Sequence, residues 1–268
     1  MTPWVMRLIL ANAAVYLLQL TLPQGVWTQF AFVPAALFQR PWTTVTYMFL
    51  HGGFLHILFN MWIFYIFGRR LELRLGARQF LILYFIGGIS GAVLSSILGL
   101  LAIMGLLPSV APTIYIIPII GASGAVFGIE LAYAMYWPRD KIWIWGVLPI
   151  EVRWLVIFLT GLSLFAGFSG AGDGVAHFAH LGGFAGAFLY LKFIEWHSPA
   201  RRFKKAAAPP KPRGGPAAVQ RWHGIRRDGL HQVNRDELDR ILDKISAKGL
   251  ASLTPEEQAF LERFSGGH

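Results

Sequence analysis

The sequence predicts an all-α polytopic membrane protein, in which a bundle of six transmembrane helices is followed by a small cytoplasmic helical hairpin. Of the 268 residues, 55% are hydrophobic and 14% are charged, and the mean hydropathy is +0.50. Soluble domains carry about 25% charged residues, so this composition is typical of a chain that lies mostly in lipid. Six apolar runs come near the length that a bilayer-spanning helix needs. They cover about residues 5–22, 54–68, 79–107, 119–137, 154–170 and 175–194.

The first apolar run is interpreted as a membrane span. It opens a series of similar segments, and no small-residue cleavage site of the signal-peptide kind follows it. The outward segment that comes next, residues 23–53, is rich in aromatic residues, and we expect it to rest in the outer membrane interface. Three prolines then interrupt the apolar stretch before the fourth span, at positions 108, 112 and 118. Non-helical backbone there requires cover from protein or from a water-filled cavity.

The distribution of basic residues predicts the orientation, because short cytoplasmic loops retain Lys and Arg. Six spans put both termini on one side, and the opposite loops contain only Arg40. The cytoplasmic side would hold the tail together with Arg7, Arg69, Arg70, Arg74, Arg78, Arg139, Lys141 and Arg153. The net charge of +10 reflects this bias and a basic tail, so membrane lipids are expected partners and nucleic acid is not.

The chain contains no cysteine, which excludes disulfides, thiol catalysis and thiolate metal sites. The lack of cysteine and the single short tail module fit a multi-pass protein of a bacterial inner (cytoplasmic) membrane.

Three segments are predicted along the chain. Residues 1–195 form the membrane domain, residues 196–233 form a basic linker rich in Pro and Ala, and residues 234–268 form the cytoplasmic hairpin. A hairpin this short has little core of its own, so we expect it to be marginally stable unless it docks on a cytoplasmic partner.

Helix signals define the hairpin. Gly249 stops its first helix, and Thr254 with Pro255 opens the second. One apolar face of the first helix carries Leu238, Ile241, Leu242 and Ile245.

Polar residues gather at one predicted depth. With both termini in the cytoplasm, the second, fourth and sixth spans run from outside to inside, so their first turns lie together below the outer surface. Polar side chains at membrane depth are costly and therefore functional candidates. Those turns or their flanks carry His51, His56, Asn60, Ser123, His177 and His180. Glycines on the fourth and sixth spans allow close helix approach: Gly121, Gly124, Gly128, Gly182, Gly183 and Gly186.

This pattern favours acyl transfer. A serine becomes nucleophilic when a neighbouring base removes its proton, and neutral imidazole is the usual base near pH 7, so His180 could serve Ser123. Unpaired N–H groups at the helix start, next to Gly121, could bind the oxyanion together with the side chains of His56 and Asn60. The nearest acid in sequence to His180 is Asp173, to which we assign no catalytic role. The predicted catalytic unit is therefore a Ser/His dyad.

Each of these residues has a simpler interpretation. Ser123 alone would more often be a helix-packing residue, and Asn60 could be a helix–helix hydrogen bond. His177 is interpreted as lining a cavity, and His51 as shaping the outer loop. Glu130 lies about 10 Å below the serine along its helix, so we expect it to be protonated or hydrogen-bonded in the bundle and not catalytic.

A metal or haem site built from the four histidines in a transporter or redox protein is the main rival to the dyad.

The motifs resemble those of the rhomboid intramembrane serine proteases. "HGGFLHILFNMW" (51–62) is similar to the family's second-helix motif, "GASGAVFG" (121–128) to its serine motif, and "AHLGGFAGAF" (179–188) to its histidine motif. "LELRLG" (71–76) resembles the cytoplasmic turn after the second helix. Taken singly the serine motif is weak, but the set on alternate helices is specific. The resemblance covers roughly residues 1–195.

The resemblance implies a six-helix rhomboid-like bundle that cleaves transmembrane segments of membrane proteins near the outer face, without a cofactor or metal. Ser123 would be the nucleophile and His180 the base, while His56 and Asn60 with the backbone at Gly121 would form the oxyanion hole. Phe127 and Gly183 would pack around the site. A catalytically inactive relative that only binds membrane helices is the other alternative.

Two departures from the family are visible. Phe127 stands where some members have a tyrosine stacked on the catalytic histidine. "PWTT" (41–44) lacks the Trp-Arg pair of the first outer loop, unless Arg40 replaces it.

Overall fold

The computed structural model describes residues 2–144, 146–169, 176–198, 222, 224–225, 228 and 230–265. Asp173 and most of the predicted linker lie outside these residues. The chain divides into two compact units, Met1–Trp196 and His197–His268, and each is described by itself.

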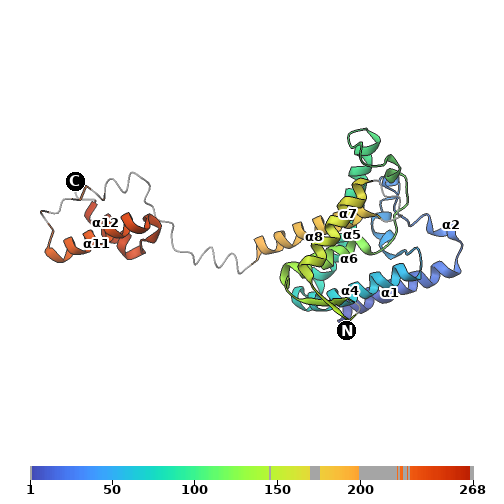
Figure 1. Ribbon diagram of the computed structural model, residues 1–268, viewed down its shortest axis with the longest axis horizontal. Coiled ribbons are helices and arrows are strands. Elements are labelled where there is room, and N and C mark those ends of the chain that lie inside the picture. Colours follow the sequence, from blue (N-terminus) through green and yellow to red (C-terminus); the bar gives the residue numbers. More distant parts are fainter. Residues whose placement is uncertain are drawn as a thin grey trace. The chain divides into compact units, whose positions relative to one another are not determined.

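The first unit is a helical bundle (Figure 1), which confirms the all-α prediction for the membrane domain. Its long helices correspond in order to the predicted spans. They are α1 (Pro3–Thr21), α4 (Phe54–Leu75), α5 (Ala77–Ile103), α6 (Ser123–Tyr136), α7 (Val152–Ser169) and α8 (His177–His197). A core of aromatic side chains with no exposed surface, among them Phe64, Phe80 and Tyr84, lies between α4 and α5.

Within the described residues, α1, α5 and α7 are long and apolar enough to cross a membrane. A fourth span is reached only if α4 is joined with the bent segment Thr43–Phe49, which it meets at 97°. The count of six spans therefore stays a prediction.

α6 is short. Its 14 residues measure about 21 Å, against roughly 30 Å for the hydrocarbon core of a bilayer. The predicted span began at residue 119, but Ile119 instead forms an antiparallel bridge with Phe32 of the outer segment, with N···O distances of 3.0 and 2.6 Å. The backbone N–H of Gly121 donates to Tyr47 O at 2.9 Å. The outer segment thus fixes the approach to the first turn of α6.

The outer segment is built from short helical pieces, which are α2 (Gln24–Trp27), η1 (Pro34–Ala36), α3 (Thr43–Thr46) and η2 (Tyr47–Phe49). Two side chains tie the segment together. Trp42 Nε1 donates to Gln29 O at 3.1 Å, and Arg40 Nη1 donates to Thr28 O at 3.4 Å. Arg40 and Trp42 therefore anchor this loop at adjacent carbonyls, although their sequence order differs from the family's pair.

α4 extends beyond its predicted end at residue 68. It continues through a basic stretch to Leu75 and ends at Gly76, whose φ of 80° favours glycine. On this extension the buried Glu72 carboxylate accepts the backbone N–H groups of Trp4 and Val5, at 3.1 and 3.0 Å. Those N–H groups have no partner within α1, and a negative charge there also complements the helix dipole. Glu72 thus ties the start of α1 to the end of α4.

A two-stranded sheet, absent from the prediction, follows α6. Strand β1 (Lys141–Ile144) pairs antiparallel with β2 (Leu148–Glu151), with Lys141 opposite Glu151. Gly146 in the turn has a φ of 71°, a conformation that glycine adopts without strain. Figure 1 shows this hairpin at the same end of the unit as the N-terminus.

The second unit contains α11 (Gln232–Lys248), η4 (Leu250–Ser252) and α12 (Pro255–Ser265). The predicted apolar face of α11 is buried together with Leu253 and Leu261. Trp222 and Ile225, which the sequence assigned to the linker, also belong to this core. The unit therefore has more core than a bare helical hairpin.

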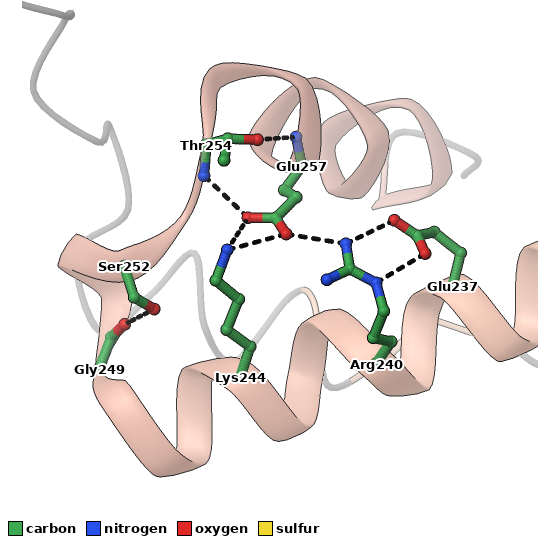
Figure 2. Close-up of polar contacts among 7 residues, drawn as sticks. All are labelled: Glu237, Arg240, Lys244, Gly249, Ser252, Thr254 and Glu257. Atoms are coloured by element: carbon green, nitrogen blue, oxygen red, sulfur yellow. Dashed lines mark hydrogen bonds and ion pairs between the residues drawn. The ribbon is translucent and has the colours of Figure 1, made fainter.

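A buried carboxylate joins the two helices of this unit (Figure 2). Glu257 accepts hydrogen bonds from Lys244 Nζ at 2.7 and 2.9 Å, from Arg240 Nη2 at 2.8 Å and from the backbone N–H of Thr254 at 2.8 Å. The Glu257 N–H donates in return to Thr254 Oγ1 at 3.2 Å. Thr254 and Glu257 thus form a capping box at the start of α12, and Glu237 holds Arg240 from its other side.

Acidification is expected to weaken this unit. Hydrogen bonds from Lys244 and from the Thr254 N–H lower the pKa of Glu257 from 4.5 to about 2. A carboxyl with a lowered pKa stabilises the fold above pH 4.5, and this contribution is lost as the pH falls from 4.5 toward 2. Its upper limit is about 3 kcal/mol, which solvent around the half-exposed Arg240 reduces. At neutral pH, Glu257→Gln should speed hydrogen exchange in α11 and α12 of the full-length protein.

The matched control for Glu257 is Glu262→Gln, which removes an exposed charge from the same helix. Equal exchange rates in the two variants, or a Glu257→Gln effect that persists unchanged at pH 2, would contradict the expected role of Glu257.

Candidate active site

The site begins with the contact between α6 and α8, which lie backbone against backbone. A Cβ atom added to Gly128 would be 3.0 Å from Gly183 O, and one on Gly124 would be 3.2 Å from Ala179 O. A Cβ on Gly183 would collide with the Gly124 carbonyl. Glycine at these positions allows the two helix axes to approach more closely than side chains would permit.

This close approach brings the predicted serine and histidine together. Ser123 is the first residue of α6, and His180 lies in the first turn of α8. The Ser123 Oγ and the His180 Nε2 are 2.8 Å apart, which is hydrogen-bond distance. The His180 side chain is largely buried, with 8% of the residue exposed. A nucleophile and a base at this distance have the geometry that proton transfer requires.

The imidazole of His180 is held by an aromatic stack. Phe127 lies one helical turn after Ser123, and its ring is 4.0 Å from that of His180 with an interplanar angle of 17°. Ser123 and the ring that stacks on His180 therefore lie on the same helix, α6. The stack limits rotation of the histidine ring without adding a polar group.

His56 presents a hydrogen-bond donor to the same place. The backbone N–H of Gly52 donates to its Nδ1 at 3.3 Å, so the neutral ring carries its proton on Nε2. A Cβ atom on Gly121 would lie 2.8 Å from this Nε2 and 3.8 Å from Ser123 Oγ. With a φ of +122°, Gly121 suits this position on conformational grounds as well as steric ones.

Asn60 is oriented by its own helix. Its Nδ2 donates to the His56 backbone carbonyl at 2.9 Å, which occupies one of the two amide protons. The residue is buried and lines the same cavity as Ser123. The second proton is available to a group that enters the cavity.

The cavity in front of these residues has a volume of about 590 Å³. Its polar lining comprises Ser123, His180, His56 and Asn60 together with Ser95, Thr113 and His177, and most of the remaining wall is apolar. Residues 111–120, which precede α6 and include the 3₁₀ helix η3 (Pro112–Tyr115), supply much of that wall. The lining thus suits a hydrophobic peptide segment with one reacting polar group.

Sequence reasoning did not identify Ser95 as part of this cavity. Ser95 on α5 is 4% exposed, lines the cavity, and has no hydrogen-bond partner for its Oγ within the described residues. It belongs to no motif, and its only signal is a hydroxyl in an apolar span.

The other histidines surround the site. His51 is buried with its ring edge-on to that of His56, at a centroid distance of 5.0 Å, and Gln19 bonds its backbone N–H and carbonyl. His177 lines the cavity, with its ring 6.2 Å from that of His180. In the described part of the chain, no three or more His, Cys, Asp or Glu side chains are grouped so as to hold a metal ion.

Glu130 lies deeper in α6, with 1% of the residue exposed. Its Oε2 has no hydrogen-bond partner within the described ranges. The hydrogen-bonded state expected from the sequence is therefore not observed for this oxygen, which leaves protonation as the way to avoid a bare buried charge.

A family model described as the rhomboid domain matches residues 39–196, more than half of the chain. The chain belongs to the rhomboid family. The predicted recognition is confirmed, and a multi-pass membrane location follows for this rhomboid chain. A second model, a family of unknown function (DUF6576), matches residues 231–267.

Three curated relatives illustrate the range of the rhomboid match. RHOMBOID-like protein 4 of Arabidopsis thaliana is 32% identical over 154 residues, which are 57% of this chain and 34% of the plant protein. Rhomboid-like protease 3 of Toxoplasma gondii is 32% identical over 173 residues, 62% of this chain and 57% of that protein. Putative rhomboid protease YdcA of Bacillus subtilis is 29% identical over 163 residues, 60% and 71% respectively. The chain thus matches about a third of the length of its plant relative.

Proposed function

We propose that this rhomboid is an intramembrane serine endopeptidase that cleaves transmembrane segments of membrane proteins near the outer face, with Ser123 as nucleophile and His180 as base. The observation that carries the proposal is the 2.8 Å contact between Ser123 Oγ and His180 Nε2 at the wall of a largely apolar cavity. Relatives that are named as proteases support intramembrane proteolysis at the level of the family.

The reaction follows from the positions of the groups. His180 Nε2 takes the proton from Ser123 Oγ as the oxygen attacks the scissile carbonyl carbon. The negative charge that develops on the carbonyl oxygen is stabilised by the Nε2–H of His56, the free amide proton of Asn60 and helix-start N–H groups. Breakage of the C–N bond transfers the proton from His180 to the departing amine. Water then attacks the acyl-enzyme by the same route in reverse.

The length of α6 favours cleavage below the membrane surface. If the helix ends at the cytoplasmic interface, its length of about 21 Å leaves its first residue roughly 9 Å inside a 30 Å hydrocarbon core. Ser123 would then meet substrate helices near their outer ends, and the cavity would bring water to that depth. The depth given for Ser123 depends on the predicted orientation, in which both termini lie in the cytoplasm.

Cleavage of a model transmembrane substrate in proteoliposomes tests the proposal. The wild type is expected to cut the substrate and to be labelled by a fluorophosphonate at Ser123, whereas Ser123→Ala should fold and do neither. An inactive, unlabelled wild type would contradict the proposal. Metal analysis of that protein would then distinguish an inactive helix binder from a histidine metal site, because stoichiometric metal favours the latter.

Loss of the aromatic stack is expected to slow the reaction without removing its chemistry. Phe127→Ala frees the His180 ring, and since such a pair contributes about 0.5–1.5 kcal/mol, cleavage and fluorophosphonate labelling should both fall by about 2- to 13-fold. Phe127→Tyr keeps the stack and serves as the rescuing control. A labelling rate unaffected by Phe127→Ala would show that the stack does not position His180.

A further inference from the structure

A second cavity lies at the opposite end of α4 and α6 from the site of Ser123. Its volume is about 570 Å³, and it is bounded by the start of α1, the last turns of α4 and the later part of α6. The lining residues are Thr2, Tyr65, Ile66, Arg69, Arg70, Leu73 and Tyr133. Ten residues of α6 separate Tyr133 from Ser123, which corresponds to about 15 Å. The cavity is therefore not part of the candidate active site.

Two arginine side chains, those of Arg69 and Arg70, line this cavity and offer hydrogen-bond donors to it. Arg69 Nη1 donates to Tyr65 Oη at 2.9 Å, and Arg70 Nη1 donates to Tyr133 Oη at 3.3 Å and forms an ion pair with Asp140. Every one of these contacts uses Nη1, so Nε and Nη2 of both arginines can bind a further acceptor. With Asp140 as the one acid paired to Arg70 in the described residues, the two arginines leave a net positive charge.

An unpaired hydroxyl completes the cavity. Thr2 is 9% exposed, and its Oγ1 has no hydrogen-bond partner within the described residues. A buried hydroxyl without a partner costs free energy unless an acceptor or donor reaches it. Two guanidiniums, the buried Thr2 hydroxyl and the Tyr65 phenol form a set of donors that matches the oxygens of a phosphate, while the Tyr133 hydroxyl already donates to Asp140 Oδ2 at 2.8 Å.

The rim of the cavity suggests where that phosphate comes from. Leu73 is 78% exposed and Ile66 is 36% exposed, so apolar side chains of α4 face outward beside the arginines. Such an apolar rim suits contact with membrane lipid. Basic pockets at the cytoplasmic ends of spanning helices bind anionic headgroups. A free phosphate ion would gain nothing from these apolar neighbours.

We propose that this cavity binds the phosphate of an anionic glycerophospholipid in the cytoplasmic leaflet. Arg69 and Arg70 bind the phosphate oxygens, Thr2 donates its hydroxyl proton, and Ile66 and Leu73 lie along the acyl chains. A lipid held there joins the start of α1 to α4 and α6, next to the link that Glu72 makes between α1 and α4.

Native mass spectrometry of the full-length protein, purified in a neutral detergent, tests this site. Phosphatidylglycerol and phosphatidylcholine are titrated separately, and the bound lipid is counted. The wild type should retain one phosphatidylglycerol with at least about 10-fold higher affinity than phosphatidylcholine, because both lipids carry a phosphate but the choline ammonium leaves phosphatidylcholine with no net charge to attract the two arginines. Arg69→Gln and Thr2→Val should each weaken phosphatidylglycerol binding by about 5-fold or more. Neither variant removes the pair between Arg70 and Asp140.

Arg74→Gln is the matched control, because Arg74 is on the same helix, lies over the Tyr136 ring and does not line the cavity. It should leave the affinity within about twofold of the wild type, since a charge outside the cavity contributes only by screened attraction. Equal losses in Arg69→Gln and Arg74→Gln, or equal binding of the two lipids, would overturn the proposal in favour of a general charge effect. Inorganic phosphate is titrated as well. Saturable phosphate binding that requires Arg69, without retention of phosphatidylglycerol, would overturn the lipid assignment.

Discussion

His180→Ala is expected to lower cleavage of a transmembrane substrate by about 10³-fold or more, while the protein stays folded in the membrane. The variant removes the only group placed 2.8 Å from Ser123 Oγ in the described residues, and serine without a base is a poor nucleophile. The His180 ring is largely buried against the Phe127 ring, so its removal also leaves a space beside Phe127. Initial cleavage rates and fluorophosphonate labelling, measured in the same proteoliposomes, give the loss of cleavage and the loss of serine reactivity.

His177→Ala is the matched control for that measurement. His177 is on the same helix, lines the same cavity and has its ring 6.2 Å from that of His180. Because His180 makes the 2.8 Å contact with Ser123 Oγ, removal of His177 should change the rate by less than about 10-fold, as expected for a residue outside the proton transfer. Comparable losses in the two variants would mean that the histidines act on the cavity as a whole, and His180 would lose its assignment as the base.

Gly183→Ala is expected to reduce activity by about 100-fold and to destabilise the protein by about 1–3 kcal/mol, although it adds a single methyl group. The new Cβ would collide with the Gly124 carbonyl, and a backbone atom cannot turn aside as a side chain can. α8 must therefore move away from α6, and a displacement on the order of 1 Å separates His180 from Ser123. Thermal unfolding and fluorophosphonate labelling would measure the two consequences.

Gly161→Ala provides the comparison for Gly183→Ala. A Cβ at Gly161, on α7, would have no atom within 4 Å, so this variant should keep its activity and gain slightly in helix propensity. An active, stable Gly183→Ala variant would show that the close α6–α8 contact is not needed to hold the pair together.

The meeting of Ser123 and His180 could be expected from the sequence for two reasons. Alternate spans run in the same direction, so their first turns share a depth, and glycines on both helices permit close approach. The stacking of Phe127 on His180 also agrees with the resemblance that first suggested it. These features depend on helix direction and small residues, which the chain displays directly.

Other features depend on three-dimensional contacts that the pattern of residues in the sequence does not show. The basic residues from Arg69 to Arg74 were interpreted as a loop, yet they are good helix formers and extend α4. The sheet around Gly146 has no alternation of polar and apolar residues, so its strand period was hidden. The Asn60 amide bonds its own helix, a contact that the sequence did not indicate, and this leaves one amide proton for the oxyanion. Trp222 lies in a segment whose composition indicated a linker, but it is buried in the second unit.

The unequal lengths of α5 and α6 have a consequence for substrate choice. α5, with 27 residues, measures about 40 Å, whereas α6 measures about 21 Å, so no single bilayer thickness matches both helices. The longer helix must tilt or the membrane around the bundle must deform, and Ser123 is fixed relative to the protein while a substrate helix is fixed relative to the lipid. Under the proposed function, the bond that is cut is selected partly by its height in the bilayer. Two substrates with different sequences but equal hydrophobic lengths would then present their scissile bonds at the same level.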